Sequence, residues 1–346
     1  MKRIITIIFT FLFFVACKQA YQPRNIDKIT IKEFKIEGAS IRAIEVLDKD
    51  NIVYATSNGS IGYFSDDKKN KSIYKPVYQD SIIPNFRSIA VNNEAIFALS
   101  IENPALLYKI YEDEITLIYK ETHEKVFYDT LTFFDDYKHG IAVGDPTENC
   151  ASIIITQDGG ENWHKIPCEN LPEIAKGEAF FAASNTNIKT IGSTVWIASG
   201  GAKANILKSN NYGKTWQVFS TPIIQGNGPQ GIYSIDFLDK NNGIIIGGDY
   251  SKPLENKANK AITANGGKTW QLVANKQIPN YKSCVQYVPN TFGKEVFAVG
   301  KTGVSFSNDG GKTWSDISKD SYYAIQFADK NTAWLSGNEK IGKLEF

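Results

Sequence analysis

TQDGGENW, at residues 156–163, is the first of four similar eight-residue segments in this sequence. The others are SNNYGKTW (209–216), TANGGKTW (263–270) and SNDGGKTW (307–314). A Gly-containing tetrapeptide between two apolar runs predicts a hairpin turn, in which Asp or Asn accepts hydrogen bonds from the turn's amides and Trp packs on the sheet. Spacings of 53, 54 and 44 residues predict one β unit repeated, each needing its neighbours to bury its faces.

The four stretches resemble the Asp-box (BNR) repeats of sialidase-like β-propellers. The phrases around them are similar to the photosystem II stability/assembly factor-like branch: FRSIAV, GIAVGDP, GEAFFAASN, GIYSIDF with GIIIGGDY, and YKSCVQYVP. The resemblance covers roughly residues 38–346. It implies an all-β propeller and a role in assembling a complex. Asp boxes are parts of the scaffold, so they imply no activity.

The innermost strands of the expected blades can be aligned along the chain. Six begin at residues 42, 87, 129, 233, 283 and 323, and a seventh is expected near 178. We therefore expect an all-β, seven-bladed propeller of four-stranded antiparallel blades. The last blade has three strands before Phe346, and the N-terminal strand 29–36 would close it.

The first 17 residues are predicted to be a lipoprotein signal peptide. Lys2 and Arg3 precede an apolar run from Ile4 to Ala16, which is short for a bilayer span and typical of a signal core. The run ends in a sequence similar to a lipobox, so Cys17 is expected to be lipidated; a plain secretory peptide is the alternative. Lys18 favours the outer membrane, facing the periplasm. We expect residues 18–25 to be a tether and 26–346 a single domain.

Three cysteines remain after Cys17. Cys150 and Cys168 flank the first repeat and lie across from each other in the hairpin register that pairs Thr156 with Trp163. A disulfide between them is our hypothesis, and it suits an oxidising compartment. We expect Cys284 to be a small buried apolar side chain.

One face of the inner strands starts with a polar position and continues with apolar ones. The polar positions, which we call the polar rung, are Arg42, Arg87, Asp129, Tyr233, Ser283 and Tyr323. In an antiparallel blade the start of the inner strand shares one end with the longer loops, here 144–148, 199–203 and 248–259. Irregular polar loops on one face of a rigid scaffold are where binding concentrates.

This reasoning predicts a binding site at the loop-rich mouth. Two arginines on adjacent blades would donate hydrogen bonds together to an extended peptide, a carboxylate or a sugar. The alternative is that Arg and Asp side chains pair with each other and only seal the ring. The predicted site residues are Arg42, Arg87, Asp129, Asp145, Glu178, Asp249, Tyr250, Lys252, Tyr281 and Ser283.

Other site chemistries find less support. Sialidase chemistry needs three arginines around a carboxylate, and only two lie in the blades. A different glycosidase would need two carboxylates on one mouth, which Asp129, Asp145, Glu178 or Asp249 would supply. The motif GNGPQG at 226–231 contains Pro and precedes a strand, so no dinucleotide site is expected. The three histidines are scattered, so neither a metal site nor a catalytic triad is expected.

With 42% apolar residues, 22% charged residues and a net charge of +1, the composition favours neither nucleic acid nor acidic substrates. We expect a membrane-anchored, monomeric lipoprotein in the cell envelope that acts as a non-catalytic binding or assembly module and uses no cofactor. Its partner would be an envelope protein, or a glycan or peptide ligand. The alternative function is a carbohydrate-active enzyme that uses carboxylates at the mouth.

Overall fold

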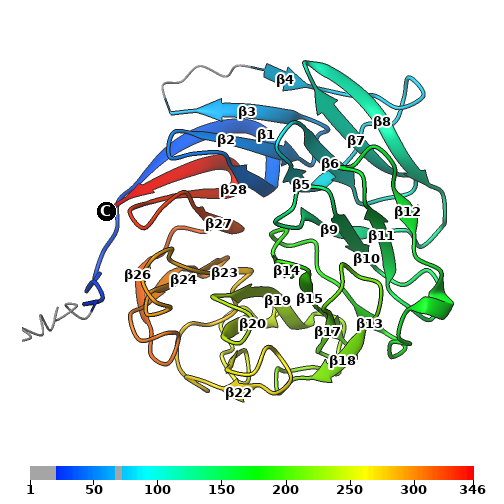
Figure 1. Ribbon diagram of the computed structural model, residues 1–346. Helices are drawn as coiled ribbons and strands as arrows, with labels where there is room; N and C mark the ends of the chain where they lie inside the picture. Colours follow the sequence, from blue (N-terminus) through cyan, green and yellow to red (C-terminus); the bar gives the residue numbers. More distant parts are fainter. Residues whose placement is uncertain (1–20, 67–71) are drawn as a thin grey trace, which may run out of the picture.

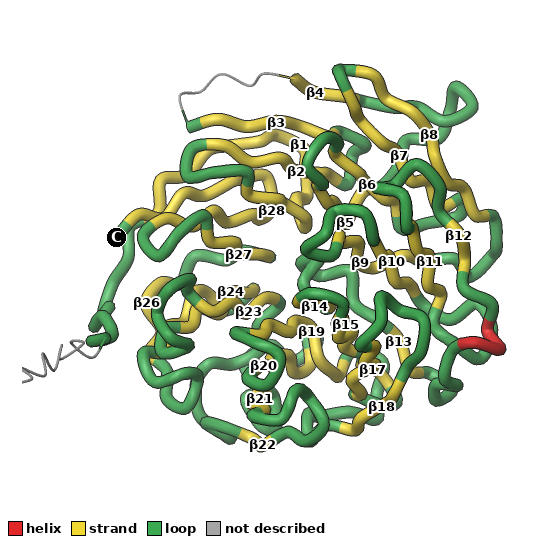
Figure 2. Tube along the Cα trace, viewed as in Figure 1, coloured by secondary structure: helices red, strands yellow, loops and turns green. Residues whose placement is uncertain are grey.

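The computed structural model describes residues 21–66 and 72–346. Its strands are arranged radially in one ring (Figure 1). The one helical element in these residues is the 3-10 turn η1 (Cys168–Asn170), which lies at the outer rim (Figure 2). The fold is therefore an all-β propeller.

The strands of the described residues form six antiparallel sheets, four of which have four strands. The first two of these contain β5 (Phe86–Val91), β6 (Ile96–Ser100), β7 (Ala105–Tyr111) and β8 (Glu114–Glu121), then β9 (Tyr128–Phe133), β10 (Gly140–Gly144), β11 (Ser152–Thr156) and β12 (His164–Lys165). The other two contain β14 (Ile188–Ile191), β15 (Thr194–Ala198), β17 (Asn205–Ser209) and β18 (Gln217–Ser220), then β23 (Cys284–Tyr287), β24 (Val296–Gly300), β25 (Gly303–Ser307) and β26 (Ser315–Ser318).

The remaining two sheets have six strands each. One has the order β27 (Ala324–Phe327), β28 (Thr332–Glu345), β1 (Ile31–Val46), β2 (Asn51–Thr56), β3 (Ile61–Ser65) and β4 (Ser72–Tyr74). The other has the order β13 (Glu178–Ala179), β16 (Gly200–Gly201), β19 (Gln230–Phe237), β20 (Gly243–Asp249), β21 (Lys260–Thr263) and β22 (Gln271–Leu272).

The prediction of seven blades is wrong. With one sheet counted as one blade, the propeller has six. The reason is that β1 is one long strand: its residues 31–35 pair with β28, and its residues 41–46 pair with β2. The predicted closing strand and the predicted first inner strand are therefore continuous, and they join the expected first and last blades in one sheet.

The inner strand expected near residue 178 is also misplaced. The innermost strand of its sheet is β14, which begins at Ile188. The segment at 178–179 forms the two-residue strand β13, which pairs with β16 and extends the neighbouring sheet. The apolar residues of GEAFFAASN are typical of a strand. In the structure only Glu178–Ala179 form one, and the rest of the segment passes from one sheet to the next.

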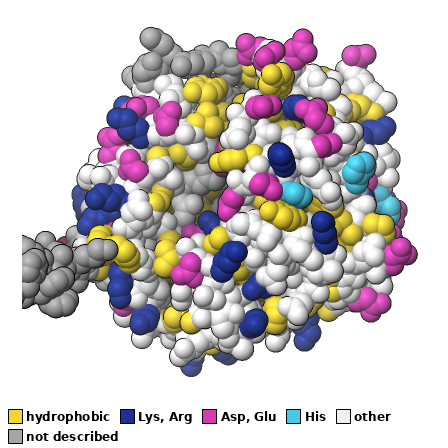
Figure 3. Space-filling view, in the orientation of Figure 1, with side chains coloured by type: hydrophobic (Ala, Val, Ile, Leu, Met, Phe, Trp, Pro, Cys, Tyr) yellow, Lys and Arg dark blue, Asp and Glu magenta, His cyan; other side chains and the backbone are white. Residues whose placement is uncertain are grey.

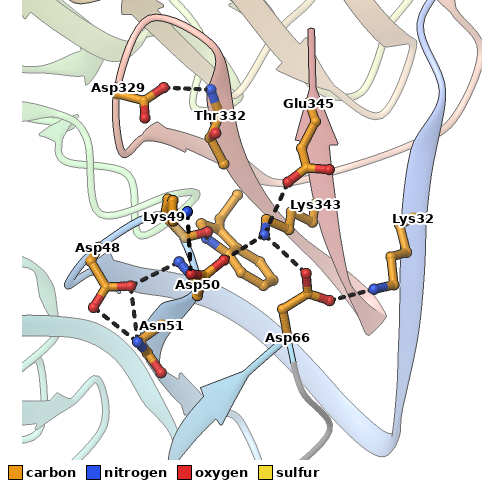
Figure 4. Close-up of polar contacts among 11 residues, drawn as sticks. Lys32, Asp48, Lys49, Asp50, Asn51, Asp66, Asp329, Thr332, Lys343 and Glu345 are labelled. Atoms are coloured by element: carbon orange, nitrogen blue, oxygen red, sulfur yellow. Dashed lines mark hydrogen bonds and ion pairs between the residues drawn. The ribbon is translucent and has the colours of Figure 1, made fainter.

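A cluster of charged side chains joins β28, near the C-terminal end of the chain, to β1 and to the segments next to β2 and β3. Lys343 of β28 has its ammonium nitrogen 3.0 Å from Asp50 Oδ1, 2.9 Å from Asp66 Oδ2 and 3.1 Å from Glu345 Oε1, and Lys32 pairs with Asp66 from the other side (Figure 4). The Lys343 side chain is only 2% exposed. Burial alone would lower its pKa, but the hydrogen bonds to the three carboxylates raise the pKa above its usual value.

The turn of the first repeat has the predicted chemistry. Thr156 Oγ1 accepts a hydrogen bond from Gly160 N at 3.0 Å, and Asp158 Oδ1 accepts one from Asn162 N at 3.0 Å. Gly160 has φ +91°, in the left-handed region that favours glycine. Trp163 leaves the turn and is buried. The other three copies repeat these hydrogen bonds.

Hydrophobic clusters lie between neighbouring sheets. In one of them, Phe97 of β6, Phe133 of β9 and Trp163 pack together, with ring centroids 4.8–6.4 Å apart. Burying one such side chain stabilises the fold by about 1.5–3 kcal/mol. The second position of the predicted inner-strand face is buried in each of the six aligned strands: Ile44, Ile89, Leu131, Ile235, Val285 and Ile325.

Residues 21–25 lie against the disc. The Arg24 side chain is ion-paired with Glu295, and Asn308 Nδ2 donates to Asn25 Oδ1 at 2.9 Å. Arg24 Cζ also lies 4.2 Å from the ring centroid of Phe346, so the described N-terminal end and the C-terminal end share one edge of the disc (Figure 1). This part of the expected tether is bound to the propeller.

Candidate functional site

A cavity of ≈ 700 Å³ opens at the end of the ring where the inner strands begin. All six residues of the polar rung line it, although they come from six different strands or the residues just before them. We call it the arginine cavity. Its other lining residues are Phe127, Asp145, Ala179, Phe180, Phe181, Ala182, Ala183, Gly228, Tyr250, Tyr281, Lys301 and Ser321.

The two arginines have unused hydrogen-bonding capacity. Arg42 lies with its guanidinium carbon 4.1 Å from the ring centroid of Tyr323, and its Nη1 donates to the Ala183 carbonyl at 3.4 Å. The Nε atoms of Arg42 and Arg87 are buried and have no partner. In the described part of the chain, neither side chain makes an ion pair within 4.0 Å of a carboxylate. Burial and the nearby Arg42 lower the pKa of Arg87.

Two carboxyl groups share the cavity with the arginines. Asp129 is fully buried, and neither carboxylate oxygen has a hydrogen-bond partner of ordinary geometry. Burial, and secondly the charge of Asp145, raise the pKa of Asp129 well above its usual range, and Arg87 and nearby backbone N–H groups offset only part of this effect. Burial raises the pKa of Asp145 to about 6, although its Oδ1 accepts a hydrogen bond from Phe180 N at 2.7 Å. The neutral form of Asp129 is therefore favoured, which leaves the cavity with a positive balance.

Aromatic rings form one wall of the cavity. Phe181 and Tyr233 stack with centroids 4.0 Å apart, and Tyr281 meets Tyr233 edge to face at 4.9 Å. Burial raises the pKa of Tyr233 and of Tyr281, so both hydroxyls stay protonated at neutral pH. Tyr250 lies at the rim and is 54% exposed. This wall offers apolar area beside the guanidinium groups.

The structure does not bring every predicted site residue into the cavity. Arg42, Arg87, Asp129, Asp145, Tyr250, Tyr281 and Ser283 line it, but Glu178, Asp249 and Lys252 do not.

The three residues outside the cavity lining have partners of their own. Glu178 is buried and accepts hydrogen bonds from Ser199 Oγ, Asn205 Nδ2 and Ala175 N. Asp249 accepts from the hydroxyl and amide of Ser251 and from Gln230 Nε2. Lys252 Nζ lies 3.6 Å from Glu255 Oε1. Glu178 lies outside the cavity because it belongs to β13 and not to an inner strand.

Sequence reasoning did not assign Tyr233, Tyr323, Phe181 or Lys301 to the site. Tyr233 and Tyr323 were on the polar rung, and that position was the signal for them. Phe181 belongs to the segment whose strand was misplaced. Lys301 lies in the short turn between β24 and β25, and nothing in the sequence marks it.

Cys150 and Cys168 are joined by a disulfide, with their Cα atoms 5.7 Å apart. Hairpin pairing of Ile154 with Lys165 and of Ile155 with His164 brings the two segments together. Cys284 is buried and free. Cys17 lies outside the described residues. Among the described residues, no helix has the length and apolar character needed to cross a membrane, and no group of three or more His, Cys, Asp and Glu side chains could hold a metal ion.

Basic and acidic side chains are interspersed on the face of the disc shown in Figure 3. That mixture agrees with the net charge of +1. The positive balance inside the arginine cavity is therefore a local feature of the site and does not extend over that face.

Solved structures match the fold of the chain over nearly its whole length. The structure described as "YCF48 bound to D1 peptide" aligns with a TM-score of 0.67 and 13% identity, covering 94% of this chain and 98% of that one. The fold is that of a propeller protein. "YCF48 from Cyanidioschyzon merolae" aligns with a TM-score of 0.59 and 13% identity, covering 91% and 98%. "Structure of U3-55K" aligns with 0.67 and 12%, covering 91% and 98%.

No family model and no curated protein matches the sequence. At 12–13% identity, the likeness to the solved structures shows the fold alone. The site must therefore be argued from its own residues.

Proposed function

We propose that the protein is a non-catalytic binding module that captures an acidic segment of a protein partner in the arginine cavity. One observation carries the proposal: Arg42 and Arg87 line the same cavity, and among the described residues neither guanidinium group has a carboxylate within ion-pairing distance. A carboxylate that reaches the parts of these guanidinium groups that line the cavity would form charge-assisted hydrogen bonds with them.

The shape and walls of the cavity favour a peptide. A volume of ≈ 700 Å³ accommodates a few residues of an extended chain. The stacked rings of Phe181 and Tyr233 offer an apolar surface beside the guanidinium groups, a combination common at interface hot spots. The structural neighbour described as YCF48 bound to a D1 peptide is a propeller that holds a peptide, which adds support by analogy.

The proposal extends to the cellular setting. The apolar run at 4–16 and the following Cys17 support a lipid anchor in the cell envelope, at the outer membrane facing the periplasm. The repeated turns support membership in the Asp-box propellers and in their assembly-factor-like branch. A lipid-anchored propeller with a peptide-binding mouth would help to assemble or stabilise a membrane-associated complex.

The alternative function is a glycosidase-like enzyme. Its support is the pair Asp129 and Asp145, which line one cavity and both have a raised pKa. A raised pKa suits a general acid. The other two carboxylates considered for this role, Glu178 and Asp249, hold hydrogen bonds elsewhere. Hydrolysis of envelope glycans that is lost in Asp129→Asn would favour the enzyme over the binding module.

Photo-crosslinking in the native envelope tests the binding proposal. Tyr250, at the cavity rim, is replaced by p-benzoylphenylalanine in the full chain, and Tyr137 in the turn between β9 and β10 serves as the matched control because it is 44% exposed at the opposite end. The proposal expects one protein adduct from position 250 that Arg87→Glu abolishes. Equal adducts from both positions, or none from 250, would contradict it.

A further inference from the structure

The path of the N-terminal chain is fixed where it reaches the disc. Arg24 donates from its backbone N to Glu295 Oε1 and from Nε to Glu295 Oε2, both at 2.8 Å, and the Tyr21 hydroxyl also donates to Oε1. Glu295 is fully buried. A buried carboxylate held by a forked guanidinium is costly to release, so the chain leaves the propeller beside Glu295.

An apolar surface with basic neighbours surrounds this exit point. Phe292 is 75% exposed, its ring centroid lies 5.8 Å from that of Tyr21, and Leu238 is 41% exposed. Phe292, Leu238, Lys294 and Lys312 line one groove of ≈ 560 Å³. We call Tyr21, Leu238, Phe292, Lys294 and Lys312 the Phe292 patch.

Two contacts hold this surface in place. The loop that carries Phe292 packs on the last repeat turn, because Gly310 N donates to the Lys294 carbonyl at 2.8 Å. An atom added at the Cα of Gly293 would meet Leu238 Cδ2 at 2.5 Å, so Leu238 lies directly on this loop. Phe292 has φ +56°, a conformation that L side chains rarely adopt, and its ring is nevertheless presented outward.

The short distance in sequence between Tyr21 and Cys17 indicates that this patch lies near a membrane. Cys17 precedes Tyr21 by four residues, and a fully extended chain spans about 14 Å over that distance. With Cys17 lipidated, the bilayer surface lies within that reach of the patch. This step rests on the anchor included in the proposed function.

We propose that the Phe292 patch rests on the surface of an anionic lipid bilayer. Phe292 and Leu238 enter the interface, and Lys294 and Lys312 face the phosphate headgroups. β23 begins directly after Ser283, which lines the arginine cavity, and the chain that follows β23 leads to the loop that carries Phe292, so the two sites lie beyond opposite ends of this strand. The arginine cavity therefore opens away from the membrane, toward partners in the aqueous phase.

Lipid photo-crosslinking tests this orientation. The full chain carries p-benzoylphenylalanine at Phe292 or, as the matched aromatic control, at Tyr250, and is reconstituted in vesicles of phosphatidylethanolamine with phosphatidylglycerol. Both side chains are largely exposed, so both variants should melt like the wild type. Lipid adducts are expected on the proteolytic fragment that contains residue 292 and not on the one that contains residue 250.

A charge variant tests the role of the lysines in the same vesicles. Lys294→Glu and Lys312→Glu should each lower the lipid adducts at position 292 by about fivefold, and vesicles of zwitterionic lipid alone should remove this difference. Equal lipid adducts at 292 and 250, or none at 292, would overturn the membrane-facing assignment. Protein adducts from position 250 in the native envelope report on the proposed function separately, so each proposal fails independently.

Discussion

Arg42 lies over the ring of Tyr323, with its guanidinium carbon 4.1 Å from the ring centroid. The two residues belong to β1 and to the segment just before β27, strands of the sheet that joins the two chain ends. Stacking on an aromatic face positions a guanidinium without neutralising its charge. Arg42 is thereby held at the wall of the cavity with its positive charge retained.

The ring of Tyr323, rather than its hydroxyl, is expected to matter for ligand binding. Tyr323→Phe should bind an acidic peptide as the wild type does, because the stacking surface is retained. Tyr323→Leu should bind about two- to thirtyfold more weakly, since a cation–π contact contributes about 0.5–2 kcal/mol. Fluorescence anisotropy with a labelled peptide measures both. A weakened Tyr323→Phe variant would assign the effect to the hydroxyl instead.

Asp145 is expected to make stability depend on pH. Burial raises its pKa to about 6, whereas the unfolded value is about 3.9. Between these values the folded state binds more protons, so the contribution of this group to the free energy of unfolding falls as pH rises from about 4 to about 6. Asp145→Asn keeps an oxygen acceptor for Phe180 N and removes the titration.

Urea unfolding at pH 4 and pH 7 measures this effect. Relative to the wild type, Asp145→Asn should gain roughly 2 kcal/mol between the two pH values. A stability difference between variant and wild type that is the same at both pH values would show that Asp145 titrates normally.

Lys343 is expected to stabilise the closed ring. Lys343→Met removes the ammonium shared by Asp50, Asp66 and Glu345 and should lower the free energy of unfolding by about 1–3 kcal/mol. The control is Lys35→Met, because Lys35 pairs with Glu37 on the exposed surface and such pairs contribute little. If both variants unfold at the same urea concentration, the charged cluster around Lys343 does not stabilise the fold.

The disulfide is expected to be a second source of stability. Cys150 and Cys168 are 18 residues apart, and closing a loop of this length contributes about 3 kcal/mol in the chain-entropy model. Replacing both by Ser should lower the free energy of unfolding by that amount, while reduction should no longer affect the variant. Thiol titration of denatured, unreduced wild type that found both thiols free would contradict the bond.

Sequence reasoning predicted the repeated turns because their chemistry is local. The Thr156 and Asp158 hydrogen bonds need only residues within four positions in the chain. The number of blades depended instead on whether 31–46 is one strand or two, and on which segment pairs innermost near 178. Both are decided by long-range pairing, which alternation of apolar residues does not specify.

Some residues of the candidate site could likewise be predicted from the sequence, and others could not. Arg42, Arg87 and Asp129 were found because inner strands in equivalent positions bring the same rung to one cavity. Asp249 and Lys252 were expected at the mouth from loop position alone. The loop is folded so that Asp249 accepts hydrogen bonds from Ser251, two residues further along the chain, and Lys252 pairs with Glu255. Side-chain partners within a loop decide such cases, and the sequence does not show them.

Selection from a peptide library measures whether the arginine cavity recognises acidic peptides. Random decapeptides with free carboxyl ends are selected on the immobilised full chain, and their affinities are compared for the wild type, Arg42→Ala, Arg87→Ala and the control Lys252→Ala. We predict enriched peptides that carry Asp, Glu or the terminal carboxylate as their anchor, with binding about 10- to 100-fold weaker in each arginine variant and unchanged in the control. Enriched peptides without an acidic anchor, or equal binding by all four proteins, would show that Arg42 and Arg87 do not form the binding site.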